Sequence, residues 1–168
     1  MTRKLICRYF CLLASMLSFQ TMAIDPELVV VRNINFGTIL PVVGSCRMIA
    51  STGAVSSYAG QYICLLTDSA QNGLYTIMAN ANKNIRVKVL PNLDNGDGYV
   101  FNPFIEIVSQ GQATQVISNN IGFKSINSGA DGLVNLYIGG DFVLNTSLAN
   151  GQTIEFNFID AIEWYEDP

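Results

Sequence analysis

Apolar and polar residues alternate in short runs along most of this 168-residue chain. The clearest runs are Ile85-Arg86-Val87-Lys88-Val89 and Ile154-Glu155-Phe156-Asn157-Phe158. Because successive side chains of a strand point to opposite faces, this period of two predicts strands with one buried and one solvent-exposed face. We predict further strands over Leu28–Asn33, Arg47–Ala50, Gln61–Leu66, Leu74–Ala79, Phe104–Val108, Val134–Ile138 and Phe142–Asn145.

Clusters of Gly, Asn, Asp and Ser separate these runs and predict turns, because such residues accept left-handed backbone at low cost. The clusters are Asp94–Gly98, Ser128–Gly132 and Asn150-Gly151. Gly139-Gly140 lies between two apolar runs, so we predict a two-residue hairpin turn there. No stretch carries an apolar stripe with helical period, and the pattern therefore predicts an all-β, antiparallel β-sandwich.

The first twenty-three residues differ from the rest. Thr2-Arg3-Lys4 is a positive start, Leu5 to Phe19 is apolar, and Thr21-Met22-Ala23 is a small-residue cleavage site. This order is typical of a secretory signal peptide. The apolar run is shorter than the roughly 20 residues of a membrane-spanning helix and Arg8 interrupts it, so we expect no transmembrane span. We expect residues 1–23 to be removed and residues 24–168 to form one exported domain.

Removal of that segment would change the charge. The whole chain has a net charge of −4, and the loss of Arg3, Lys4 and Arg8 leaves six cations against thirteen carboxylates, a net charge of −7. Nucleic-acid binding depends on clustered Lys and Arg, and only Arg86 and Lys88 fall close together. We therefore expect no nucleic-acid partner.

Two of the four cysteines, Cys46 and Cys64, lie outside the predicted signal peptide. In an oxidising compartment such a pair favours a disulfide over two free thiols. A metal site is the weaker alternative, because structural zinc sites draw four ligands from Cys and His and this chain has no histidine.

The missing histidine also removes Ser-His-Asp and Cys-His machinery. The carboxylates follow no distinctive motif, and Asp94-Asn95-Gly96-Asp97-Gly98 has glycine where a calcium loop needs a ligand. We expect no catalytic residues, no cofactor and no metal, and we do not expect an enzyme.

Several positions together resemble a known family. They are Asn35-Phe36-Gly37-Thr38-Ile39, Gly53, Gly73-Leu74-Tyr75-Thr76-Ile77 and Tyr137–Phe142 followed by Gly151. In this order they resemble the bacterial domain of unknown function 4402, a family of small exported proteins that look like pilin subunits. The resemblance implies an immunoglobulin-like or pilin-like sandwich. This chain departs from the family in its cysteine pair and in its ending, Trp164–Pro168.

The resemblance also implies a way of assembling. Pilins complete a sandwich with a strand donated by a neighbour or a periplasmic chaperone. The candidate donor runs from Ile24 to Phe36, where Leu28, Val30, Ile34 and Phe36 share one face of an extended strand and Arg32 interrupts it. The alternative is that this segment is the first strand of its own domain.

The leading expectation is therefore a non-enzymatic exported structural or adhesive protein, a fimbrial subunit in the periplasm, at the cell surface or outside the cell. The alternative is a secreted β-sandwich module that binds a surface glycan or host receptor. In that module, aromatic side chains such as Tyr58, Tyr99, Tyr137 or Trp164 would stack on sugar rings.

Overall fold

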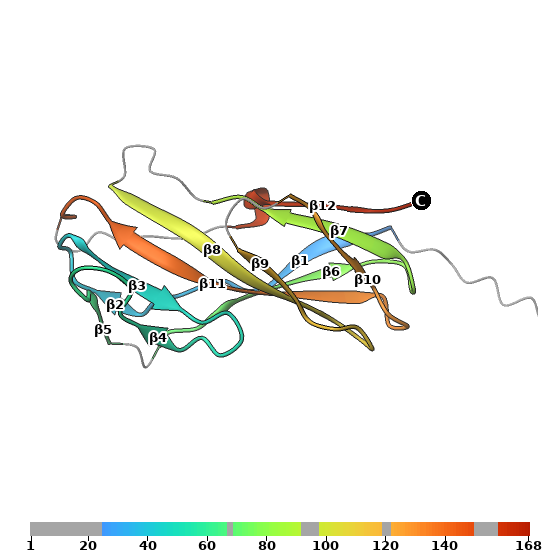
Figure 1. Ribbon diagram of the computed structural model, residues 1–168, viewed down its shortest axis with the longest axis horizontal. Helices are drawn as coiled ribbons and strands as arrows, with labels where there is room; N and C mark the ends of the chain where they lie inside the picture. Colours follow the sequence, from blue (N-terminus) through green and yellow to red (C-terminus); the bar gives the residue numbers. More distant parts are fainter. Residues whose placement is uncertain (1–24, 67–68, 92–97, 119–121, 150–157) are drawn as a thin grey trace, which may run out of the picture.

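The computed structural model describes residues 25–66, 69–91, 98–118, 122–149 and 158–168 (Figure 1). Strands make up nearly all of its regular structure. They are β1 (Glu27–Arg32), β2 (Thr38–Ile39), β3 (Gly44–Met48), β4 (Val55–Ser56), β5 (Cys64–Leu66), β6 (Gly73–Met78), β7 (Asn84–Val89), β8 (Tyr99–Ser109), β9 (Gln115–Ser118), β10 (Lys124–Asn127), β11 (Leu133–Leu144) and β12 (Ile162–Glu166). A short 3-10 turn, η1 (Ile159–Ala161), precedes β12.

The main sheet is organised around β11. On one side β11 pairs with the whole of β8, from Val134 opposite Ser109 to Leu144 opposite Tyr99. On the other side it pairs with β6 as far as Ile138 and with β3 from Gly140 onward. β1 extends the sheet beyond β6, β4 lies beside β3, and β9 lies beside β8. The central strand therefore changes partner at Gly139.

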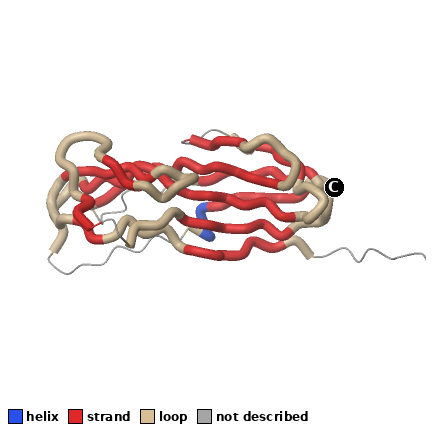
Figure 2. The backbone as a smooth tube through the Cα atoms, turned by 90° about the horizontal axis from the view of Figure 1, so that it is seen from below, coloured by secondary structure: helices blue, strands red, loops and turns tan. Residues whose placement is uncertain are grey.

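A smaller sheet, in the order β10-β7-β12, forms the second layer of the sandwich (Figures 1 and 2). All pairings between named strands are antiparallel. Ile85, Val87 and Val89 of β7 are buried in one core with residues of the main sheet, while Arg86 is exposed. The predicted all-β, antiparallel sandwich is confirmed. The alternating residues of β7 face the core and the solvent in turn, as predicted.

Aromatic rings fill the centre of the core. Phe36 lies edge-on to Phe101 with ring centroids 5.8 Å apart, and its centroid is 5.6 Å from that of Phe142. Phe158 packs on Phe101 at 5.0 Å. Large buried rings contribute much of the apolar area that stabilises a sandwich. The core thus joins residues from the start, middle and end of the chain.

The predicted hairpin at Gly139-Gly140 is wrong, because residues 133–144 form one strand. The two glycines allow the neighbouring strands to approach β11 closely. A Cβ on Gly139 would lie 2.4 Å from the Met48 carbonyl oxygen and 2.6 Å from the Ala50 nitrogen, and Gly140 has φ +148°. Glycine is required here because β3 meets β11 where β6 ends. The predicted turn at Ser128–Gly132 is present.

Other predictions fall partly or wholly outside the described residues. These are the signal peptide over residues 1–23, most of the turn at Asp94–Gly98, the turn at Asn150-Gly151 and most of the strand at Ile154–Phe158.

Candidate functional site

The predicted disulfide is confirmed. Cys46 on β3 and Cys64 on β5 are bonded, with Cα atoms 6.1 Å apart and both side chains buried. β5 pairs with β2, so the bond ties this two-stranded sheet to the main sheet. The segment between the two cysteines is therefore held at both ends.

The N-terminal segment forms the first strand of its own domain, as the alternative interpretation has it. β1 pairs with β6 from Glu27 opposite Met78 to Arg32 opposite Leu74. Leu28 packs against the core, and Ile34 and Phe36 are buried. Val30 lies opposite the buried Tyr75, as Leu28 lies opposite the buried Ile77, so the Leu28 and Val30 side chains share one face, although Val30 is 37% exposed at the edge of the sheet. The pairing is irregular between Val30 and Arg32, which shifts the alternation that the sequence alone implied.

The outer edge of β1 is a candidate contact surface. β1 is the last strand on its side of the main sheet among the residues that the structure describes. Val31 is 57% exposed and, with Val29 and Val30, makes the middle of the strand entirely apolar. The backbone groups on such an edge are a template for pairing with another chain.

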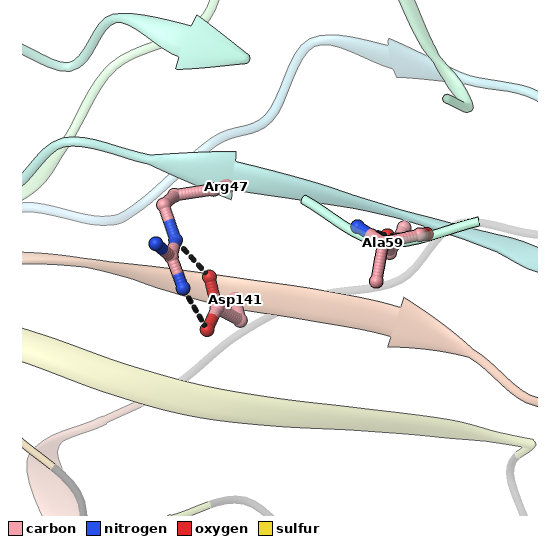
Figure 3. Close-up of polar contacts among 4 residues, drawn as sticks. Arg47, Ala59 and Asp141 are labelled. Atoms are coloured by element: carbon pink, nitrogen blue, oxygen red, sulfur yellow. Dashed lines mark hydrogen bonds and ion pairs between the residues drawn. The ribbon is translucent and has the colours of Figure 1, made fainter. Parts of the chain in front are cut away.

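A second candidate is a charged cluster on the outer face of the main sheet, where Arg47 of β3 lies opposite Asp141 of β11 (Figure 3). Arg47 Nε donates to Asp141 Oδ1 at 2.5 Å, and Nη2 donates to Oδ2 at 2.8 Å. The Asp141 side chain is only 3% exposed, whereas that of Arg47 is 41% exposed. The hydrogen bond to Asp141 is the main cause that raises the pKa of Arg47 above its ordinary value. The guanidinium is therefore charged and fixed in orientation by two bonds.

Aromatic rings flank this guanidinium. Its Cζ lies 4.5 Å from the ring centroid of Tyr58 and 5.2 Å from that of Phe104 on β8. Ser45 holds the segment that carries Tyr58, since its Oγ accepts a bond from Ala59 N at 2.9 Å and also donates to Ala59 O. Figure 3 shows Ala59 on its own segment, apart from the Arg47–Asp141 pair. The cluster is thus assembled from β3, β8, β11 and the disulfide loop.

A hollow of about 200 Å³ opens beside Arg47. Its wall combines one cation, one carboxylate and apolar groups. The lining residues are Arg47, Met48, Ile49, Ala50, Phe104, Ile105, Glu106 and Val116. Within the described ranges, no group of three or more Cys, Asp or Glu residues could hold a metal ion. The side chains that line the hollow offer hydrogen-bonding groups and apolar surface.

Sequence reasoning missed most of this cluster. Of the aromatic residues named for stacking, only Tyr58 belongs to it; Trp164 packs against the core, and Tyr99 packs on Phe142 with centroids 6.0 Å apart. Arg47 and Asp141 are separated by 94 positions. The available signal was Asp141 itself, an acidic residue placed next to Phe142 and Val143 in an apolar run.

No family model, curated protein or solved structure matches this chain. The resemblance to the domain of unknown function 4402 therefore stays a prediction. No helix in the described part of the chain is both long and apolar enough to cross a membrane.

Proposed function

We propose that this chain is a non-enzymatic, exported structural or adhesive subunit of the fimbrial type, which joins neighbouring subunits by strand addition at β1. The observation that carries the proposal is the apolar outer edge of β1. A neighbour's strand placed there would extend the main sheet through main-chain hydrogen bonds and cover the exposed valines.

The other sheet edges are less suited to this role. Natural proteins protect an edge with charged side chains, with proline or by keeping the strand short. β12 carries Glu163 and Glu166, β10 begins with Lys124, and β9 and β4 have four and two residues. β1 has six residues and no charge between Glu27 and Arg32. Although its pairing with β6 is irregular near Val31, β1 is the longest of these edge strands and is apolar at its centre, so we take it as the edge that most favours pairing.

Three further features support export and assembly outside the cytoplasm. The order of charge, apolar run and small residues in positions 1–23 is typical of a signal peptide. The Cys46–Cys64 bond suits an oxidising compartment. The resemblance to small exported pilin-like proteins agrees with both. We place the protein in the periplasm, at the cell surface or outside the cell.

The test is the oligomeric state of the full chain, expressed with export and purified from a periplasm. Light scattering after size exclusion should show oligomers, which a peptide copying residues 24–36 converts to monomers by capping the edge. Val31→Lys should also give monomers, because an edge lysine opposes pairing. A monomer that is indifferent to the peptide would contradict the proposal.

Val116→Lys is the matched control. Val116 is 57% exposed, as Val31 is, but lies on the β9 edge. This variant should form the same oligomers as the unmodified chain. If Val116→Lys dissociates the oligomers and Val31→Lys does not, assembly uses β9 and the assignment to β1 is wrong.

A further inference from the structure

We propose that the hollow beside Arg47 binds one neutral sugar ring of a glycan. The site lies on the outer face of the main sheet, where β3, β8 and β9 contribute its wall. Its volume of about 200 Å³ is below the roughly 300–1,000 Å³ of pockets that enclose drug-sized ligands. A single ring is therefore the scale of ligand that it can hold.

Arg47 supplies the hydrogen-bond donors. A guanidinium has five N–H groups, and Asp141 accepts from two of them. Among the described residues, no acceptor is assigned to the other three. Because Asp141 and the two rings already hold the group in place, a ligand that accepts from Arg47 costs little side-chain ordering.

Glu106 supplies the acceptor. It lies on β8 between Tyr137 of β11 and Val116 of β9. Its carboxylate makes no hydrogen bond or ion pair with another residue in the described ranges, although it lines the same hollow as Arg47. Hydroxyl groups both donate and accept, so a ring with several hydroxyls can satisfy Glu106 and Arg47 together.

The charge of the hollow selects against anions. Asp141 already neutralises Arg47, so the charge of Glu106 is left without a partner in the wall. A phosphate, sulfate or carboxylate ligand would meet this like charge at short range. The site therefore favours a neutral ligand over an acidic one.

Apolar side chains form the rest of the wall of the hollow. Phe104, Ile49 and Val116 line the hollow, and they offer surface to the C–H groups of a sugar ring. Small-ligand sites combine such surface with a few polar groups that fix orientation. The wall beside Arg47 has this composition.

The test is saturation-transfer NMR titration of the full, exported chain with methyl glycosides of glucose, galactose, mannose and N-acetylglucosamine. At least one should bind in the millimolar range. Glu106→Gln should weaken that binding by about tenfold or more, since hydrogen bonds to charged groups are the stronger ones. Phe104→Leu should weaken it through lost ring contact.

Glu163→Gln, on the outer face of the smaller sheet, is the matched control and should leave the affinity unchanged. The proposal is overturned if none of the glycosides binds, or if Glu106→Gln and Phe104→Leu both bind as the unmodified chain does. Binding of methyl glucuronide as tight as that of methyl glucoside would also overturn it. These readouts do not involve the β1 edge, so they are independent of the assembly test.

Discussion

Two arginine–aspartate pairs lie on the outer faces of the two sheets, and they differ in how the fold holds them. Arg47 and Asp141 are opposite each other on adjacent strands of the main sheet. Arg86 of β7 pairs with Asp167, the residue before the last, at 3.1 Å. Each arginine also lies over a tyrosine, with Cζ 4.5 Å from the Tyr58 centroid and 5.7 Å from the Tyr165 centroid.

Burial separates the two pairs. The Asp141 side chain is 3% exposed, whereas those of Arg86 and Asp167 are 47% and 24% exposed. Hydrogen bonding to an aspartate is the main cause that raises the pKa of each arginine. Both guanidinium groups are charged at physiological pH, as arginine is without any such shift. The same two side chains therefore fix the orientation of the guanidinium where the fold buries the aspartate, and we expect the more exposed pair to contribute little to stability.

The largest loss of stability should come from Cys46→Ser, which also frees the loop beside the Arg47–Asp141 pair. The disulfide spans 18 positions and encloses the segment that carries Tyr58. Its loss should lower the free energy of unfolding by about 3 kcal/mol. Urea denaturation without reductant measures this. The double variant Cys46→Ser, Cys64→Ser should lose the same amount, and free thiols in the unmodified exported protein would contradict the prediction.

The next largest loss of stability should come from Gly139→Ala, because the added methyl group would push β3 away from β11 close to the Arg47–Asp141 pair. The added Cβ would meet backbone atoms of Met48 and Ala50 that have little room to move. We expect a loss of about 2–3 kcal/mol in thermal or urea unfolding, typical of overpacking. The control is Gly122→Ala, where a Cβ meets no atom within 4 Å. Equal stability of the two variants would argue against the close approach.

Arg47→Ala tests the buried pair directly. It leaves Asp141 buried and without its partner, which should cost about 2 kcal/mol in urea unfolding. This is less than the roughly 3–5 kcal/mol of a fully buried pair, since Arg47 itself is 41% exposed. Arg47→Ala with Asp141→Asn should recover part of the loss. If the double variant is less stable than Arg47→Ala alone, the penalty does not come from the unpaired charge.

The smallest effect should come from Asp167→Asn, which removes the exposed pair. We expect the melting temperature to stay within experimental error, at low and at high salt, because a solvated ion pair contributes little. A marked, salt-dependent drop would mean that the end of the chain matters more to the smaller sheet than its exposure suggests.

The sequence predicted those features that depend on neighbouring residues. Alternation located β7, most of β6 and the C-terminal part of β8, and the count of cysteines predicted the Cys46–Cys64 bond. Gly139-Gly140 was misinterpreted because a glycine pair between apolar runs has the same local pattern whether the chain turns or two strands approach it closely. The irregular pairing of β1 near Val31 left no local trace either.

The candidate sites were less predictable than the fold. The Arg47–Asp141 pair joins residues that only the strand order brings together, and no local periodicity encodes strand order. Tyr58 was named as an exposed aromatic, but its contact with Arg47 depends on Ser45 and the disulfide loop. Glu106 is distinguished only by the hollow that it lines.

The position of β11 late in the chain has a consequence for folding kinetics. β3, β6 and β8 all pair with β11, and all three are synthesised before it. Until β11 emerges, these strands lack their common partner, and the main sheet cannot close. Contacts of such long sequence separation slow the search for the native state and lengthen the time for which strand edges are exposed. A chain truncated before β11 should therefore aggregate instead of forming half of the sandwich.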